Sequence, residues 1–425
     1  MRDAKEYGSI LNITPVDFAG LYARFDEIRE DINMMRQAAL DELLPLVRCA
    51  EVLAQKYDVV VTNPPYMAVS NAGAKVNDYV KKNFPDSKAD LFAVFIERCE
   101  QMAKKNGYQA MITQHAWMFL SSFEKLRTKL LAVDIVNMAH LGARAFEEIG
   151  GEVVQTTSFV IRKSHIADYK GEYCRLIEPT SQQGKEDMFL AGENRYAADQ
   201  SNFSKIPGSP VAYWVNEKII GLLENKTFYD EFSFKRGLTT ADNNRFLRFW
   251  FEVNLSDESL SIYIPSRRWF SYNKGGEYRK WYGNREYVVD WENDGERLKN
   301  FSGSAMRNLA FAFSKVISYS SLTSGKLSFR MCDNCLNDQA GNYFVPTAMT
   351  TLTYALALLN SCVSEFFVKI KSQTLNTTAD DFGALPLCID SESTIENFSN
   401  DNIVLTKADW DSYETSWDFK RNPLV

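Results

Sequence analysis

Several features are scarce or absent in this sequence of 425 residues. Its seven cysteines are an odd number spread thinly along the chain, so a disulfide framework is not expected and a reducing cytoplasm is the default location. No apolar run approaches the roughly 18 residues that span a membrane, and no apolar signal core follows Met1. We therefore expect a cytoplasmic protein without a membrane partner.

The charge of the chain is negative overall but unevenly distributed. The formal net charge of −7 argues against wholesale electrostatic binding to nucleic acid or to an anionic membrane. Residues 233–330 hold 16 Lys and Arg against 10 Asp and Glu, a net charge of +6, whereas the rest of the chain carries −13. This later region is therefore the candidate for contact with an anionic partner.

Composition and apolar spacing are typical of a folded protein with two or three units, since 45% of the residues are apolar. Apolar spacing predicts helices over 15–32, 33–55, 89–105 and 122–131, and strands over 57–62, 108–113, 133–141 and 156–162. Thr14 is the expected cap of the first helix, and Pro45 is expected to kink or break the second. This alternation predicts an α/β domain with a mostly parallel sheet over residues 1–168.

The remainder of the chain has a weaker and more mixed pattern. Apolar periodicity fades after residue 164, so we expect a linker over residues 169–209. Short aromatic strands near 246–253, 261–265, 287–291 and 315–320 and a helix over 350–371 predict a mixed α+β domain over residues 210–390. Residues 391–425 would form a C-terminal extension, and no internal repeat is visible.

The sharpest local signal is Asn63-Pro64-Pro65-Tyr66, which follows the run of β-branched residues predicted as a buried strand. Ligands of an open α/β sheet bind outside the carboxyl ends of strands, which is where this tetrapeptide would lie. The Asn63 side-chain oxygen and the Pro64 carbonyl can both accept hydrogen bonds from one NH₂ group, and Pro65 stiffens the loop. Tyr66 offers a flat face to the ring that carries the amine. The alternative is a chance Pro-Pro turn with Tyr66 as a surface aromatic.

This motif resembles that of the amino-methyltransferases of the gamma type, in which it binds the target nitrogen beside S-adenosylmethionine. Family members methylate adenine or cytosine in DNA, some RNA bases, or glutamine side chains, and the motif alone does not separate these substrates. The resemblance implies catalytic roles for Asn63, Pro64, Pro65 and Tyr66. It also implies that Phe146 stacks opposite Tyr66 on a base rotated out of the duplex. For Phe146 the alternative is a core phenylalanine at a strand end.

Residues 235–246 resemble the segment that opens the target-recognition region of large adenine-specific methyltransferases. Residues 269–284 and 410–419 resemble the PglX family of adenine-specific DNA methyltransferases from bacteriophage-exclusion (BREX) systems. The resemblance extends from about Tyr7 to Phe419. It implies S-adenosylmethionine-dependent methylation of the exocyclic amine of a flipped adenine in duplex DNA, as self-marking in phage defence. The implied fold is a partial Rossmann-like methyltransferase sheet, with its preceding helices in residues 1–168, followed by a target-recognition domain over 210–390.

Basic residues interleaved with aromatic residues in the later region suit contact with DNA, because cations neutralise phosphates and Arg or Asn can read base edges. The candidate DNA-binding residues are Arg236, Thr240, Asn243, Arg245, Arg267, Arg268, Lys274 and Arg279. Each one taken alone could equally be a solvated surface group.

The sequence departs from the family in one respect. S-adenosylmethionine needs a Gly-rich turn upstream of the Asn-Pro-Pro-Tyr motif, but here only 62 mostly helical residues precede it, and Gly8 and Gly20 are isolated. The resemblance therefore implies an internal fragment of a longer protein, with an incomplete cofactor site and no activity on its own. The alternative function is a non-catalytic DNA- or protein-binding recognition module of a phage-defence complex.

Two weaker signals received structural interpretations. Cys332 and Cys335 have zinc-knuckle spacing, but no second pair follows and the three histidines lie far upstream, so no metal is expected. His115 follows a predicted strand near the motif, and we interpret it as a hydrogen-bonded structural residue, because amine methylation needs no strong base.

Overall fold

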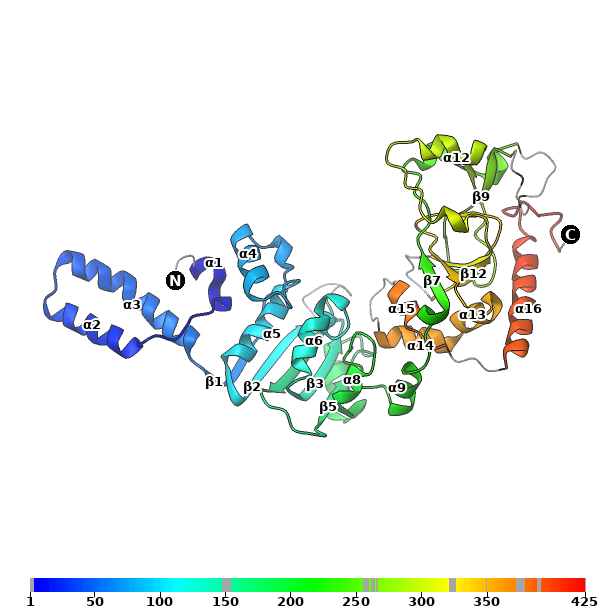
Figure 1. The fold of residues 1–425 in the computed structure, drawn as a ribbon. Helices are drawn as coiled ribbons and strands as arrows, with labels where there is room; N and C mark the ends of the chain where they lie inside the picture. The colour runs from blue at the N-terminus through cyan, green and yellow to red at the C-terminus, as the bar shows by residue number, and fades with distance from the viewer. Residues whose placement is uncertain are drawn as a thin grey trace. The chain divides into compact units, whose positions relative to one another are not determined.

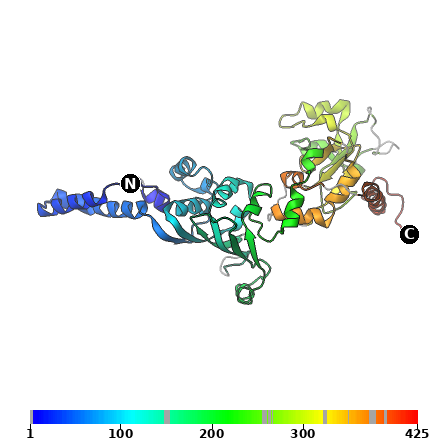
Figure 2. The same ribbon diagram turned by 60° about the horizontal axis from the view of Figure 1, so that its bottom comes forward.

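The structure is a computed structural model that describes residues 4–146, 154–254, 260, 264, 267–320, 326–348, 350–371, 379–387 and 391–424. The chain divides into two compact units, Met1–Glu217 and Lys218–Val425 (Figures 1 and 2). In the described ranges, no helix has the length and apolar character needed to cross a membrane.

The first unit is built on a six-stranded sheet of order β1-β2-β4-β3-β5-β6. Its strands are β1 (Tyr57–Thr62), β2 (Ala103–Gln114), β3 (Asp134–Gly142), β4 (Thr156–Arg162), β5 (Lys170–Arg175) and β6 (Arg195–Asp199). β1 pairs parallel to β2 and β3 parallel to β5, whereas the other three pairings are antiparallel. The prediction of a mostly parallel sheet was therefore wrong, because an apolar pattern locates strands without encoding their direction.

The helices of the first unit are α1 (Ala4–Tyr7), α2 (Phe18–Glu30), α3 (Met34–Ala54), α4 (Ala74–Asn83), α5 (Leu91–Met102), α6 (Glu124–Leu130), α7 (Gln182–Leu190) and α8 (Ser201–Ser204), with 3-10 turns η1 (Gly8–Ile10), η2 (Val69–Asn71), η3 (His115–Met118) and η4 (Ser121–Phe123). The four helices predicted in the first unit are present with shifted ends, as α2, α3, α5 and α6, whereas α1, α4, α7 and α8 were not predicted. Asp17 rather than Thr14 caps α2, since its carboxylate accepts a bond from the Gly20 amide at 2.9 Å. α3 continues through Pro45 and lies beside α2 (Figures 1 and 2).

Helices α5 and α6 pack against the sheet and close the core of the first unit. Phe92 of α5 and Leu126 of α6 meet Met111 of β2 and Phe159 of β4, and all four are at most 3% exposed. Burial alternates along β2, so one face of the strand is covered while the other is partly open. This core positions the loop that follows β1.

Strand β1 is an edge strand in this chain, with Val59 55% and Val61 72% exposed. The prediction of a buried strand was therefore wrong. A continuous run of valines indicates a strand that suits burial, but what covers a strand depends on tertiary packing.

Residues 170–204, expected within the linker over 169–209, form β5, α7, β6 and α8 and complete the sheet. Their apolar pattern is weak for a physical reason. β6 lies at the other edge of the sheet and has no fully buried residue, and α7 buries only Lys185. The compact units divide instead after Glu217.

The second unit contains two four-stranded sheets of orders β13-β9-β10-β8 and β12-β11-β14-β7. Their strands are β7 (Phe232–Lys235), β8 (Leu247–Phe249), β9 (Trp269–Asn273), β10 (Tyr287–Asp290), β11 (Val316–Tyr319), β12 (Phe329–Cys332), β13 (Leu336–Asn337) and β14 (Tyr343–Pro346). The predicted strand over 261–265 falls on residues that, apart from Ile264, lie outside the described part of the chain. These short strands with mixed helices agree with an α+β domain.

The helices of the second unit surround these sheets. They are α9 (Glu217–Leu223), α10 (Phe228–Glu231), α11 (Asn243–Phe246), α12 (Glu292–Lys299), α13 (Leu352–Leu359), α14 (Cys362–Lys371), α15 (Ala379–Gly383) and α16 (Glu392–Trp410), with turns η5 (Trp250–Glu252) and η6 (Leu309–Phe311). The single helix predicted over 350–371 is two helices, α13 and α14. Asn360 lies between them, and its side-chain amide bonds to the backbone N–H and C=O of Phe329.

Candidate functional site

The Asn63–Tyr66 loop begins directly after β1, at the carboxyl end of the strand. Pro64 is buried, whereas Asn63 and Pro65 are exposed. Among the described residues, the side-chain amide of Asn63 has no hydrogen-bond partner, so its oxygen remains available as an acceptor. The loop thus combines an anchored proline with a free amide.

Tyr66 is half-buried against the core of the first unit. Its phenol donates a hydrogen bond to the carbonyl oxygen of Ile112 on β2 at 3.3 Å, and its ring meets Phe92 edge to face with centroids 6.3 Å apart. Burial raises the pKa of Tyr66 to about 12, so the phenol is neutral at physiological pH. These contacts fix the ring at the end of the motif.

Asp90, which the sequence reasoning did not single out, ties this loop to α5. Its Oδ1 accepts bonds from the backbone N–H of Met67 at 3.0 Å and of Phe92 at 3.2 Å, while the Leu91 amide donates to the Met67 carbonyl. Burial raises the pKa of Asp90. An Asp directly before an apolar helix is a sequence signal for a cap, but its bond to Met67 is visible only in the fold.

Phe146 is half-buried and lies four residues beyond the end of β3. The adjoining residues 147–153 are outside the described part of the chain. Its stacking role opposite Tyr66 stays a prediction.

His115 and His140 form a buried pair close to the end of β2. His115 Nδ1 lies 2.8 Å from His140 Nε2, and His140 Nδ1 lies 3.1 Å from the phenol oxygen of Tyr213. Burial lowers the pKa of His115 to about 4 and lowers the pKa of His140 well below its ordinary value, so both are neutral at pH 7. His115 is thus hydrogen-bonded, as expected, and its structural role stays a prediction.

The second unit contains a cleft of about 740 Å³ that brings together four of the eight predicted DNA-binding residues, Arg236, Thr240, Asn243 and Lys274. The complete lining is Arg236, Thr239, Thr240, Ala241, Asn243, Lys274, Gly276, Ser320, Asp338, Gln339, Ala340 and Asn342. Arg236 is exposed and Lys274 lies 4.7 Å from the centre of the Tyr287 ring. Neither cation has a carboxylate partner within the described residues, so both remain available to an anion.

The other four predicted residues do not line this cleft. Arg245 on α11 is exposed, and its guanidinium lies 4.9 Å from the centre of the Phe301 ring. Arg267 is half-buried, and Arg268 bonds to Asp290 at 2.9 Å. Arg279 pairs with Asp409 and covers the ring of Trp410. The charges of Arg268 and Arg279 are thus matched by carboxylates of the protein itself.

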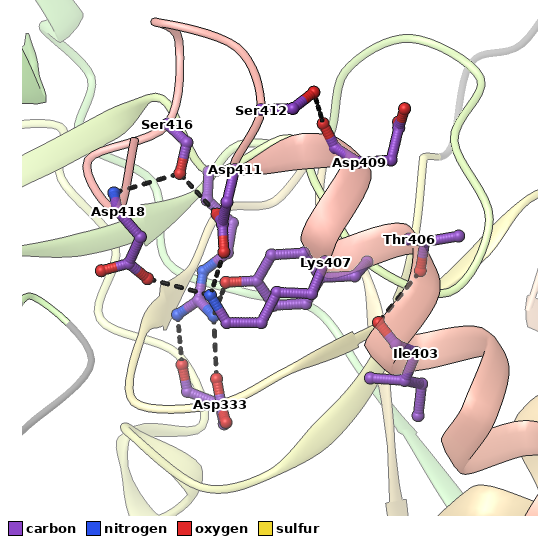
Figure 3. A network of polar contacts seen from close by, with 11 residues as sticks. Asp333, Ile403, Thr406, Lys407, Asp409, Asp411, Ser412, Ser416 and Asp418 are labelled. Carbon is purple, nitrogen blue, oxygen red and sulfur yellow. Dashed lines mark hydrogen bonds and ion pairs between the residues drawn. The ribbon is translucent and has the colours of Figure 1, made fainter. Parts of the chain in front are cut away.

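The segment 410–419, singled out by its sequence, makes a polar network within the second unit (Figure 3). Lys407 of α16 bonds to Asp411 at 2.5 Å and to Asp418 at 2.9 Å, and the Ser416 hydroxyl donates to Asp411. Arg285, which is buried, bonds to Asp333 and lies 5.1 Å from the centre of the Trp417 ring. This segment therefore holds the end of α16 in place.

Cys332 and Cys335 are both 1% exposed, as expected of buried apolar fillers. Over the ranges that the structure describes, no group of three His, Cys, Asp or Glu residues is placed to hold a metal ion.

The chain has close relatives among known proteins. Residues 16–146 match the Eco57I restriction-modification methylase family. The chain is 41% identical over 404 residues to the adenine-specific methyltransferase PglX of Lacticaseibacillus casei (strain Zhang), with 90% of this chain and 34% of that protein covered. It is 35% identical over 429 residues to the adenine-specific methyltransferase BrxX of Escherichia coli O9:H4 (strain HS), with 99% of this chain and 35% of that protein covered. The chain thus spans about a third of the length of these relatives.

A solved structure shares the fold. The type IIL restriction-modification enzyme MmeI in complex with DNA superposes with a TM-score of 0.52 and 13% identity, covering 89% of this chain and 52% of that one. At this identity the likeness shows the fold alone, and it agrees with the predicted methyltransferase sheet followed by a mixed α+β region. By sequence, the chain is similar to the adenine-specific methyltransferases PglX and BrxX over 90% and 99% of its length, and residues 16–146 match the Eco57I restriction-modification methylase family.

Proposed function

We propose that these residues belong to an enzyme that methylates the exocyclic amine of a flipped adenine in duplex DNA, with S-adenosylmethionine as the methyl donor, as self-marking in phage defence. The observation that carries the proposal is the free Asn63 amide on a proline-stiffened loop at the carboxyl end of β1. The similarity to PglX and BrxX, which are named adenine-specific methyltransferases, supports the choice of substrate.

Asn63 and Pro64 would orient the attacking nitrogen. The Asn63 side-chain oxygen and the Pro64 carbonyl each accept one N–H of the amine, which leaves the nitrogen lone pair directed away from both. Neither group titrates near neutral pH, so catalysis by this chain's residues rests on positioning rather than on proton transfer. Tyr66, held through Ile112, and Phe146 would stack on the two faces of the flipped base and offset the cost of unstacking it.

The cleft of the second unit would hold the DNA. Arg236 and Lys274 suit phosphates because their charges are not matched by carboxylates in the described residues, and Thr240 and Asn243 belong to the same lining. The DNA in the MmeI complex named above agrees with a nucleic-acid partner for this fold.

The residues that this chain supplies do not fit the methyl donor. Among the described residues before β1, helices α1, α2 and α3 take the place where a strand and a glycine-rich turn would be needed, and Gly20 lies inside α2. We therefore expect the isolated chain neither to bind S-adenosylmethionine nor to transfer methyl groups.

A second candidate is a recognition module that binds DNA or a defence protein without catalysis. The helical residues before β1 favour it for this chain taken alone. The exposed Asn63 amide favours an enzyme for the protein expressed from its native gene.

Transfer of a labelled methyl group to duplex DNA tests the proposal. We expect the protein expressed from its native gene to label adenine, and the 425-residue chain to leave DNA unlabelled and to give no heat with S-adenosylmethionine in calorimetry. Labelling of RNA or of protein instead of DNA would contradict the substrate. DNA binding without labelling by either protein would favour the recognition module.

A further inference from the structure

Gln339 lines the cleft of the second unit and is exposed, although the sequence did not mark it as a contact residue. Its Oε1 accepts a hydrogen bond from the Thr239 hydroxyl at 2.8 Å and another from Arg307 Nη1 at 3.0 Å. Arg307 is also exposed, and no carboxylate among the described residues pairs with it. Both of these hydrogen bonds hold the Gln339 amide by its oxygen.

These two bonds identify the amide oxygen and determine which atom of the Gln339 amide is left without a partner among the described residues. A guanidinium has only N–H donors, so the atom that contacts Arg307 must be the amide oxygen. A carbonyl oxygen has two lone pairs, and Thr239 and Arg307 occupy both. The Nε2 amine, with two donor hydrogens, has no partner in the part of the chain that the structure describes. Gln339 thus presents donors and no acceptor.

The turn that carries Gln339 is fixed by the backbone. The Gln339 amide donates to the Leu238 carbonyl at 3.0 Å, and the Asp338 amide donates to the Asn273 carbonyl at 2.9 Å. Gly237 passes so close to this turn that a Cβ there would lie 1.9 Å from the Asn337 carbonyl oxygen. A side chain on such a support loses little freedom when it binds, which favours selective recognition.

We propose that Gln339 reads one base pair of the DNA as a hydrogen-bond donor, with Arg307 and Thr239 as positioning residues; the inference rests on the proposed function. In the major groove, guanine offers the N7 and O6 acceptors together, so it is the base that a donor-only amide matches best. The familiar pairing of glutamine with adenine needs an amide acceptor for the adenine N6 amine, and here that acceptor is already occupied. Arg236 and Lys274 in the same lining would hold the phosphates.

Gln339→Glu tests the proposal with little change of shape. One carboxylate oxygen keeps the bonds to Thr239 and Arg307, while the other replaces the amine by an acceptor. The measurement is labelled methyl transfer by the protein expressed from its native gene. The duplexes used as substrates change each base pair of its recognition sequence in turn. We expect Gln339→Glu to methylate the original recognition sequence roughly 10- to 100-fold more slowly. The rate should recover on a duplex in which one guanine of that sequence is replaced by a base that carries an amine.

Gln182→Glu is the matched control, because it adds the same charge at an exposed residue on α7 of the first unit. This variant should keep both the methylation rate and the recognition sequence of the unaltered protein. Thermal unfolding of all variants should coincide within a few degrees. The role of Gln339 in base recognition would be overturned if Gln339→Glu methylated the same recognition sequence at an unchanged rate. It would also be overturned if the methylation rate fell equally on every duplex. In both cases the proposed function would stand. Absence of methylation by the unaltered protein would overturn both.

Arg307→Ala separates positioning from phosphate binding. Without Arg307 the Gln339 amide can rotate and offer its oxygen, so we expect discrimination to relax at the same base pair that Gln339→Glu switches. If Arg307→Ala lowered the methylation rate equally on all duplexes, Arg307 would instead contact the DNA backbone, which would contradict its positioning role.

Discussion

Asn63 is the residue on which the proposed chemistry depends, because its free amide is the acceptor that would orient the amine. Asn63→Ala removes that acceptor and leaves Pro64 and the β1 pairing intact. We expect methyl transfer to fall more than about 100-fold while DNA affinity changes less than about twofold, since positioning acts on the reacting atoms alone. Labelled-methyl transfer and DNA titration by the protein expressed from its native gene measure the two effects.

Asn71→Ala is the control for that experiment, because Asn71 is an exposed asparagine of η2 whose backbone N–H donates to the Ala68 carbonyl, a bond that the substitution keeps. It should retain full activity. Methylation by Asn63→Ala at the unaltered rate would remove Asn63 from the mechanism.

The buried histidine pair predicts a dependence of stability on pH. The folded pKa of His115 is lowered from 6.5 to about 4, so the unfolded chain binds more protons between these values and folding loses stability as the pH falls. The loss reaches at most about 3 kcal/mol for this residue near pH 4. Urea unfolding at pH 7.5, 6 and 5 measures it. A His115→Gln, His140→Gln double variant should give a shallower slope, and equal slopes would contradict the assignment.

At the scale of secondary structure, α16 depends on the polar network around Lys407. Lys407→Met removes a cation from Asp411 and Asp418 while keeping the length of the side chain. Because Lys407 is 39% exposed, water screens part of the interaction, and we expect a loss of about 1–2 kcal/mol in the unfolding free energy of the second unit. Chemical denaturation followed by tryptophan fluorescence reports it, since Trp417 lies within the network.

Lys369→Met on α14 is the matched comparison, because Lys369 is 69% exposed and forms an i,i+4 ion pair with Glu365. Its effect should stay below about 0.5 kcal/mol. If both variants lose the same amount, the network around segment 410–419 contributes no more than an ordinary surface pair.

At the scale of the whole chain, the net charge of −7 coexists with the cationic region 233–330, which supplies Arg236 and Lys274 to the lining of the cleft. If Arg236 and Lys274 each neutralise a phosphate, the Arg236→Ala, Lys274→Ala double variant should reduce the salt dependence of DNA binding by about two units of slope. Titrations of the protein expressed from its native gene from 50 to 200 mM salt provide the slope.

A second double variant, Arg24→Ala with Arg29→Ala on α2, removes the same charge from exposed pairs with Glu27 and Asp26. Its slope should equal that of the unaltered protein. A reduction of the slope by both double variants alike would mean that net charge, rather than the cleft, determines the salt dependence.

Sequence alone determined the features that depend on neighbouring residues. Thr156–Arg162 was predicted as a strand with the bounds of β4, and the Asn-Pro-Pro-Tyr motif with the later segments identified the relatives. Short-range patterns suffice there, because side-chain periodicity and motif spacing are local properties.

Only the tertiary structure decided which distant residues meet. It made β1 an edge strand, paired β4 antiparallel to β2 and β3, and joined residues 170–204 to the sheet. It also gave Asp90 its bond to Met67 and turned the Gln339 amide by contacts with Thr239 and Arg307. The physical reason is that strand direction, burial and the orientation of a polar group depend on partners far away in the chain, and no local pattern of residues encodes those partners.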